Sequence, residues 1–223
     1  MTFRRARNEE QREVRRQAIL STAEAMLAEM PVAALSLNEL SRRVGLAKSN
    51  VLRYFESREA VLLELLDAAW REWLEALEAE LGGDPPAAPV GDRVERVATA
   101  IAATLAARPM LCELASASAG VLERNISAAV AARFKRAALA NTATLGRLVH
   151  GPVPELGEPA GQRFAGAAVL MAGAVWAAAR PSAAMLAAYE ADRELAAMRL
   201  DFTAGLRELL ATLLAGFLAR PGD

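Results

Sequence analysis

The sequence predicts an all-α protein, and three observations support this. Alanine and leucine dominate a chain of 223 residues in which aromatic residues make up only 5%, a composition that favours helices over strands. Apolar residues recur three and four positions apart in successive segments, which is the spacing of a helix with one buried face. Proline and glycine gather between these segments. No alternating strand pattern and no internal repeat interrupts this order.

The first helix is expected over residues 9–30, with one apolar stripe that ends before Pro31. Residues 1–8 are expected to form a disordered basic arm. The arginines of this end of the chain are Arg4, Arg5, Arg7, Arg12, Arg15 and Arg16. Two interpretations of them stay open: a solvated charged run, or an arm that contacts DNA phosphates or the minor groove.

Two short helices with a glycine between them follow. Ser36 and Glu39 form an S-x-x-E capping box, in which each side chain satisfies a free backbone amide at a helix start. Gly45 provides the left-handed residue that ends the first helix, and the second is expected over residues 48–54. The apolar anchors are Leu37, Leu40 and Val44 in the first helix and Val51, Leu52 and Phe55 in the second. This is the helix-turn-helix pattern, whose second helix enters the DNA major groove.

The rest of the chain predicts a larger helical region. Ser57 and Ser127 stand where they can cap long helices. Helices are expected over residues 57–81, 92–108, 109–125, 127–149, 162–179 and 182–190, with a last one ending near 219. The two strongest breaks are residues 82–91 (GGDPPAAPVG) and 150–161 (HGPVPELGEPAG), which we interpret as loops.

Charge is distributed unevenly along the chain. Residues 1–60 hold 11 Arg and Lys against 8 Glu, a balance of +3, and the remainder holds 15 against 19, or −4, which adds to the net −1. The positive end is the one that carries the helix-turn-helix pattern.

Cys112 is the single cysteine, so no intrachain disulfide forms, and we expect a small buried side chain there. The N-terminus lacks the apolar core of a secretory signal, and the least polar segment, 164–179, is short for a bilayer span. We therefore expect a soluble, cytoplasmic protein with no membrane partner, no metal and no cofactor.

The helix-turn-helix pattern, placed behind one helix and ahead of a long one, resembles the TetR family of bacterial transcriptional regulators. The matching residues are the turn Gly45-Leu46-Ala47-Lys48, Val51, the run Arg53-Tyr54-Phe55, and Ser57-Arg58-Glu59-Ala60-Val61. The match covers residues 12–65; the rest agrees only in the number and order of helices. Ala47 stands where the family often has Ser or Thr, and Leu52 where it commonly has Tyr. The resemblance implies a DNA-binding domain over residues 1–56 and an effector-binding and dimerisation domain over residues 57–223.

Candidate DNA contacts lie on both short helices. Lys48, Ser49 and Asn50 occupy the first turn of the second helix, where Lys can donate to guanine and Asn can pair with adenine. The residues expected to contact phosphates are Arg42, Arg43, Arg53, Tyr54 and Arg58. A solvated surface is the alternative for any one of these charges.

The last helix carries an apolar band that predicts a homodimer. Its members are Phe202, Leu206, Leu209, Leu210, Leu213, Leu214, Phe217 and Leu218. Small residues at Gly166, Ala168, Gly173 and Ala177 allow a second helix to approach closely. Two copies would then form a four-helix bundle and place two DNA-reading helices on a palindromic operator. The alternative is that the band belongs to the core of one chain.

The resemblance also implies a small-molecule effector in the C-terminal half. The large or soft side chains available to line a pocket are Trp70, Trp73, Met110, Cys112, Phe134, Met171 and Trp176. Ordinary core packing is the alternative for each, and their apolar character favours a hydrophobic effector.

The predicted function is a transcriptional repressor that an effector releases from its operator. Control by a protein partner, or by no ligand, is the second hypothesis. An enzyme is a distant third, because the sole His150 sits in a Pro/Gly loop and no HExxH, Walker or Gly-rich nucleotide motif occurs.

Overall fold

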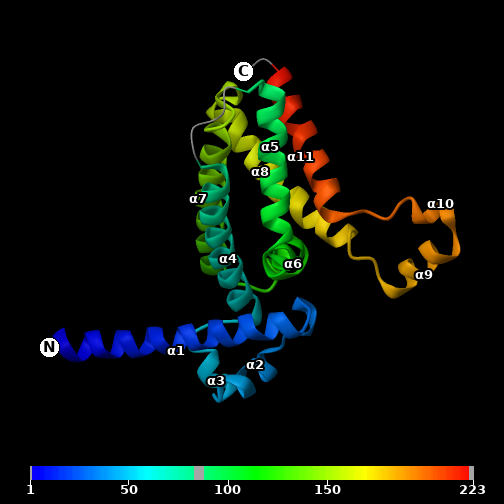
Figure 1. The fold of residues 1–223 in the computed structure, drawn as a ribbon. Coiled ribbons are helices and arrows are strands. Elements are labelled where there is room, and N and C mark those ends of the chain that lie inside the picture. The colour runs from blue at the N-terminus through cyan, green and yellow to red at the C-terminus, as the bar shows by residue number, and fades with distance from the viewer. Residues whose placement is uncertain (1, 83–87, 221–223) are drawn as a thin grey trace.

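The computed structural model describes residues 2–82 and 88–220, and within these ranges all regular structure is helical (Figure 1). The first part of the chain contains α1 (Thr2–Glu29), η1 (Val32–Ala34), α2 (Leu37–Val44), α3 (Lys48–Val51) and α4 (Arg58–Leu81). The second part contains α5 (Val90–Ala106), α6 (Pro109–Ala117), the π-helix η2 (Ser118–Leu122), α7 (Ala128–His150), η3 (Pro154–Leu156), α8 (Glu158–Ala178), α9 (Ala183–Ala191), α10 (Arg193–Ala196) and α11 (Phe202–Ala219).

Helix α4 joins two packed units. Below it α1, α2 and α3 form a small head, and above it α4 runs into a bundle with α5, α6, α7, α8 and α11 (Figure 1). Ile19, Leu40 and Val51 are fully buried in the head, while Leu77, Ile101 and Phe164 are among the buried residues of the bundle. The buried side chains of α4 extend from Ala60 to Leu81, so one helix contributes to both cores.

The N-terminal arm differs from the prediction. Helix α1 begins at Thr2, and its first half extends away from the other helices (Figure 1). The expectation that residues 2–8 are disordered was wrong. Arg, Ala, Glu and Gln are strong helix formers, and neither proline nor glycine interrupts residues 2–29.

Most other helix limits agree with the sequence patterns. The hydroxyls of Ser57, Ser127 and Ser182 accept hydrogen bonds from the backbone amides three residues later, at 3.1, 3.3 and 3.3 Å. Helix α5 begins at Val90 instead of residue 92, and residues 83–87 of the predicted loop lie outside the described residues. The helix expected over 109–125 is α-helical only to Ala117 and continues as η2, a π-helical turn.

Helix α11 divides its apolar band between two faces. Leu206, Leu210 and Leu214 are fully buried within the chain, where α11 packs against α5 and α8. Leu209 is 43% exposed on another face.

By length and composition α11 is long and apolar enough to cross a membrane, as are the bent pairs α5 with α6–η2 and α8 with α9. Packing on α5 and α8 buries 22% of this stretch of α11.

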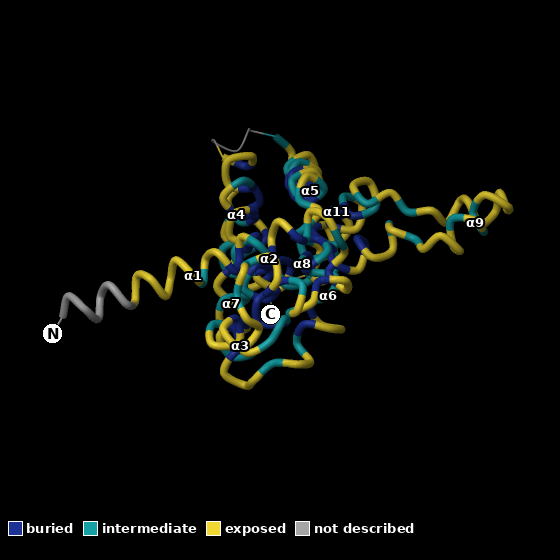
Figure 2. Tube along the Cα trace, turned by 90° about the horizontal axis from the view of Figure 1, so that it is seen from below, coloured by how far each residue is buried: buried dark blue, intermediate teal, exposed yellow. Residues whose placement is uncertain are grey.

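The segment between α8 and α11 leaves the body of the protein as an arm. It carries α9 and α10, and it projects to one side in both views (Figures 1 and 2). Neither helix contains a buried residue. Met185, Leu195 and Met198 are exposed apolar side chains on this arm.

The buried face of α11 generates a stability prediction. Leu210→Ala removes a fully buried side chain, so it should lower the free energy of unfolding by about 2–5 kcal/mol. Leu139→Ala makes the same chemical change at a side chain on α7 that is 71% exposed, and should change it by less than about 0.5 kcal/mol. Urea denaturation of both variants measures the difference. Equal losses would contradict the intrachain position of Leu210.

Candidate DNA-binding surface and ligand cavities

The corner between α2 and α3 has the predicted backbone geometry. The Ser36 hydroxyl accepts a hydrogen bond from the Glu39 amide at 3.2 Å, and Gly45 adopts a left-handed φ of 72°. The Leu46 amide donates to the Ser41 carbonyl at 3.0 Å and closes the end of α2. The capping box is only half formed, because the Glu39 carboxylate binds two arginines of its own helix instead of the Ser36 amide.

Helix α3 is short and continues as a turn. Its α-helical part ends at Val51, and the Phe55 amide donates to the Val51 carbonyl at 3.1 Å. Val51 and Phe55 are buried and fix α3 to the head. Leu52 is 41% exposed, so the expectation that it anchors α3 was wrong. Its outward position is the one at which the family commonly has Tyr.

The outer surface of the head collects polar and cationic groups. Lys48, Ser49 and Asn50 are all exposed in the first turn of α3. Beside them a polar cleft of about 420 Å³ separates α1 from the end of α3, and its lining residues are Gln11, Arg12, Arg15, Arg53 and Tyr54. Arg12 and Arg15 line this cleft; the sequence left open whether they are a solvated run or part of an arm that contacts DNA. Their spacing of three residues places them on one side of α1, which is the signal that locates them.

The arginines of α2 are held by carboxylates. Arg42 donates to Glu39 at 2.9 and 2.5 Å, and Arg43 donates to Glu39 at 2.9 Å and to Glu29 at 2.6 Å. The Arg42 hydrogen bonds, followed by those of Arg43, lower the pKa of the Glu39 carboxyl to about 2. The stabilisation from this pairing is therefore present above pH 4.5 and is lost as the pH falls towards 2. At neutral pH the carboxylate offsets part of the positive charge that α2 presents.

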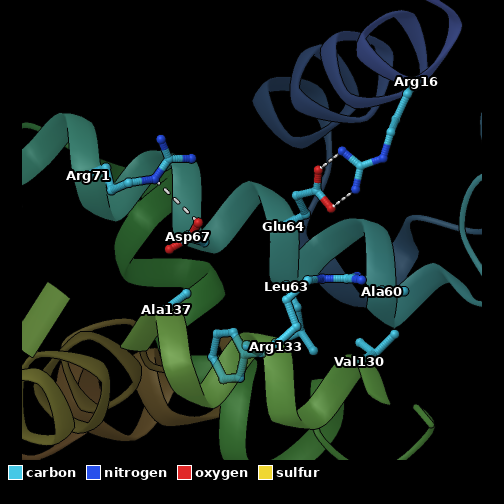
Figure 3. Close-up of a pocket in the computed structure, with 10 residues that line it drawn as sticks. Arg16, Ala60, Leu63, Glu64, Asp67, Arg71, Val130, Arg133 and Ala137 are labelled. Atoms are coloured by element: carbon cyan, nitrogen blue, oxygen red, sulfur yellow. Dashed lines mark hydrogen bonds and ion pairs between the residues drawn. The ribbon is translucent and has the colours of Figure 1, made fainter. Parts of the chain in front are cut away.

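Two further arginines make contacts inside the protein. The Arg58 guanidinium donates to the Leu35 carbonyl at 3.0 Å and to Glu59 at 3.2 Å, and this side chain is 22% exposed. Arg16 forms a two-pronged ion pair with Glu64 of α4, and its guanidinium lies 4.8 Å from the centre of the Phe55 ring (Figure 3). Phosphate contact by Arg58 stays a prediction, and the structure gives both arginines a role in holding the head to α4.

A second set of contacts ties the end of the head to the bundle. The Glu56 carboxylate accepts a hydrogen bond from the Ser127 amide at 2.6 Å, which lowers the pKa of Glu56. The Asn125 side chain donates to Glu59 at 3.4 Å. Glu56 directly follows the α3 turn, and Ser127 caps α7, so these bonds connect the head with the segment that follows η2.

The candidate ligand residues line several cavities, two of which share Trp70, and Phe134 also lines a cleft of about 240 Å³ between α4 and α7. Trp70, Trp73 and Cys112 line an apolar slot between α4, α5, α6 and α8, whose free space of about 20 Å³ is room for one water molecule. Trp70 and Phe134 line a neighbouring cleft of about 390 Å³ between α4, η2, α7 and α8. Met110 and Trp176 line a groove of about 910 Å³ between the end of α1, α6 and α8. Met171 lines none of these cavities.

Cys112 is an ordinary buried side chain in this arrangement. It is 1% exposed, and its thiol lies 3.4 Å from the Leu105 carbonyl oxygen. Burial raises the pKa of the thiol to about 12, so the group stays protonated at neutral pH. This agrees with the expectation of a small buried hydrophobic residue.

The predicted dimer residues fall on different sides of α11. Leu206, Leu210 and Leu214 lie in the core, and Phe202 packs edge-on against Trp176 with ring centres 5.1 Å apart. Leu213 and Phe217 are half-buried, and Leu209 is exposed. On α8, Gly173 lies so close to α6 that an added Cβ would meet the Ala115 backbone at 3.2 Å, whereas Gly166 faces open space. The band and the small-residue set thus serve the intrachain core in part.

The geometry defines a class of protein: a helix-turn-helix unit with an exposed polar first turn, joined through one continuous helix to a larger bundle with internal cavities. Comparison with known families agrees with this class. Residues 19–65 match the family described as bacterial regulatory proteins, tetR family, and residues 67–221 match the tetracyclin repressor-like C-terminal domain. The chain belongs to the TetR family of bacterial regulatory proteins.

Individual relatives support the same assignment. The HTH-type transcriptional regulator EthR of Mycobacterium tuberculosis, and that of Mycobacterium bovis, are 46% identical over 50 residues, which are 22% of this chain and 23% of each relative. The match therefore spans less than a quarter of those proteins. A TetR regulator from Rhodococcus sp. RHA1 has a TM-score of 0.53 at 15% identity, covering 93% of this chain and 96% of that one. FadR from Bacillus subtilis in complex with stearoyl-CoA has a TM-score of 0.55 at 13% identity, covering 90% and 98%. Both structures show that the fold is shared.

The carboxylate between Arg42 and Arg43 generates a prediction about DNA binding. Glu39→Gln leaves the Ser36 cap in place and frees the Arg42 guanidinium for phosphates, while Arg43 keeps its Glu29 partner. DNA should therefore bind more tightly, and the salt dependence should steepen by about 0.9 per added phosphate contact. Fluorescence anisotropy at several salt concentrations measures this slope. Glu24→Gln removes the same charge from an exposed position on α1 and should leave the slope unchanged. Equal effects of the two variants would show that only net charge matters.

Proposed function

We propose that this protein is a repressor that binds a palindromic operator as a homodimer and leaves it when a small hydrophobic effector binds. The observation that supports this most strongly is the outer surface of the head. A glycine-cornered pair of helices presents Lys48, Ser49 and Asn50 to solvent, with Arg53 and Tyr54 beside the cleft that Arg12 and Arg15 complete. Side chains that can read bases therefore stand next to cations that can hold phosphates.

Roles on this surface follow from position. Asn50 and Lys48 occupy the turn that enters the groove first, where Asn can pair bidentately with adenine and Lys can donate to guanine. Arg53, Arg12 and Arg15 lie to the side, where they fit the flanking backbone. Arg42 reaches phosphate by exchanging its Glu39 partner, because its side chain is 71% exposed.

The reading role of Asn50 gives a specificity prediction. Asn50→Ala should weaken binding to the best operator by about 1–3 kcal/mol while binding to random DNA changes little, because base contacts carry sequence preference and phosphate contacts do not. Competition binding against random duplex measures both quantities. Asn38→Ala, an exposed asparagine of α2, is the matched control and should alter neither. Equal losses on both DNAs for Asn50→Ala would remove it from the base-reading set.

Dimerisation is supported by apolar groups that the chain leaves uncovered. Leu170 on α8 is 73% exposed, and Leu209 on α11 is 43% exposed. The apolar arm with α9 and α10 connects these same two helices and contains no buried residue. Exposed apolar surface of this kind marks an interaction site, and a second copy related by a two-fold axis would cover it.

These exposed leucines test the dimer better than the buried ones. Leu170→Arg together with Leu209→Arg should give a folded monomer, since neither side chain belongs to the core of one chain. Sedimentation velocity should show about half the wild-type mass, and operator affinity should fall because one head covers only a half-site. Leu139→Arg changes another exposed leucine and should leave the dimer intact. A wild-type protein that is already monomeric would contradict the proposal.

The route from effector to DNA follows contacts that the structure contains. The cleft between α4, α7 and α8 is lined by Ser116, Ser118 and Ala119 of α6 and η2. The chain beyond η2 leads to Asn125 and Ser127, which bind the carboxylates on either side of the α3–α4 junction. A ligand that shifts η2 therefore changes the position of the head, provided that it binds one arrangement more tightly than the other. Release of bound DNA by a compound in a gel shift would support this route, and steady binding across a broad panel would favour control by a protein partner or by none.

A further inference from the structure

The arm at residues 181–199 contains helices that are too short to be stable in water by themselves. Helix α9 has nine residues and α10 has four, and the two pack against each other. Isolated helices of fewer than about 12–15 residues are marginal in water. Neither helix contains a buried residue, and Met185, Leu195 and Met198 of the arm are exposed. A surface outside this chain is therefore needed to cover the arm.

Both ends of the arm are held by the bundle. At the end of α8 the Arg180 guanidinium lies 4.8 Å from the centre of the Trp176 ring. At the start of α11 the Leu200 side chain lies against Gly205, so close that a Cβ added there would meet it at 2.7 Å. The arm therefore leaves the bundle in a set direction, on the side where α11 lies and away from α4 (Figure 2).

The cleft between α4, η2, α7 and α8 reaches a face of α8 that the chain leaves uncovered. Its lining is mainly apolar and includes Leu170, which is 73% exposed, and Ala174. Packed helices lie about 8–10 Å apart, and a helix of nine residues is about 14 Å long. In a dimer that pairs α8 with its own copy, the arm is therefore long enough to pass the partner's α8 and reach the partner's cleft.

The tip of the arm and the rim of the cleft carry opposite charges. Residues 190–194 (EADRE) hold three carboxylates and one arginine, a balance of −2. At the rim Glu123 and Lys135 form an ion pair at 2.7 Å and cancel. Arg124 and Arg136 follow them in sequence and leave a balance of +2. Four of these charged side chains are exposed and have no ion pair in the part of the chain that the structure describes: Glu190, Glu194, Arg124 and Arg136.

We propose that the arm of each chain packs across the mouth of the partner's cleft. Its apolar side chains then cover Leu170 of the partner subunit, and its acidic tip lies beside Arg124 and Arg136 of the partner subunit. Each effector cleft is closed by the other chain, so the site is incomplete in a monomer. This inference rests on the proposed function, because it requires the homodimer, and it adds a contact that the pairing of α8 and α11 does not need.

Charge reversal tests the contact and shows whether it joins two chains. An arm variant, Glu190→Arg with Glu194→Arg, and a rim variant, Arg124→Glu with Arg136→Glu, each bring like charges together in their own homodimers. When the two variants are mixed, every arm in a heterodimer meets a rim of opposite charge. We expect each homodimer to be about tenfold weaker than wild type, and the equilibrated mixture to contain about 90% heterodimer instead of the statistical half. Native mass spectrometry separates the three dimers.

Glu75→Arg with Glu78→Arg is the matched control. It makes the same change of charge at exposed residues of α4, on the side of the bundle away from the arm (Figure 2). Mixed with the rim variant, it should give the statistical half of heterodimer, because one mismatched contact is lost for each one formed. Equal enrichment in both mixtures would show that only net charge matters, and a statistical mixture of arm and rim variants would show that the arm does not meet the partner's rim. Either result overturns the proposal.

Closure of the cleft is tested with N-ethylmaleimide as a thiol probe. Ala138 of α7 lines the cleft, and Ala140 is exposed on another side of that helix. Ala138→Cys should react about threefold faster in the arm variant than with the normal arm, since labelling follows the fraction of time for which the arm is open. Ala140→Cys should react at the same rate in both. Cys112 is 1% exposed and leaves the measurement undisturbed. Equal rates at position 138 would overturn closure by the arm.

Failure of this inference is distinguishable from failure of the proposed function. If mixing is statistical, or the labelling rates are equal, while the wild-type dimer still prefers an operator, the regulator stands and the arm contact falls. If the wild-type chain is monomeric, or prefers no operator to bulk DNA, the proposed function itself falls and takes this inference with it.

Discussion

The structure depends on one continuous helix that belongs to two hydrophobic cores. Helix α4 begins against the head with Ala60 and Val61 and ends in the bundle with Leu77 and Leu81, all of them buried. A helix of this length transmits position because its backbone hydrogen bonds resist bending. Its lower end is also held by the Arg16–Glu64 ion pair (Figure 3) and by the bond between Asn125 and Glu59. Any displacement in the bundle that shifts α4 or the residues after η2 must therefore move the head.

Charge pairing sets how strongly the outer surface of the head acts. The net charge of −1 says little about DNA binding, because 11 of the 26 Arg and Lys lie in residues 1–60 and some of these are paired with carboxylates. Glu39 stays ionised between Arg42 and Arg43, and Arg43 donates a further hydrogen bond to Glu29. Within the described ranges Lys48, Arg53, Arg12 and Arg15 form no such ion pair, so under the proposed function they would meet a phosphate without first losing a carboxylate partner. Under the proposed function, these pairings weaken the phosphate contacts of the head, and the first turn of α3 supplies the sequence preference.

Much of the fold was predictable from the sequence because its signals are local. Serine caps, the left-handed glycine at Gly45 and helical apolar spacing each act within a few residues, and they located α2, α3, α4 and α7 closely. The packing partners of α11 were less predictable, because periodicity identifies an apolar face but not the helix that covers it. Leu210 is buried where α11 packs against α5 and α8, whereas Leu209 is exposed. The convergence of Arg12 and Arg15 with Arg53 depends on how α1 crosses α3. The surroundings of the tryptophans were also not predictable from the sequence. Their large apolar side chains suggested a pocket, but only the three-dimensional arrangement shows that the Trp70 N–H has no partner in the described ranges while the Trp73 N–H is hydrogen-bonded.

Selection from a library of random duplexes by the purified protein, at moderate salt and without added compounds, tests the central claim most directly. The claim is that two copies of the α3 surface are applied to DNA with a fixed separation. It predicts enrichment of an inverted repeat, with half-site centres about 34–36 Å or a multiple of that apart, and an even number of chains on each bound duplex. Enrichment of no sequence, or of a single unrepeated site bound by one chain, would contradict it.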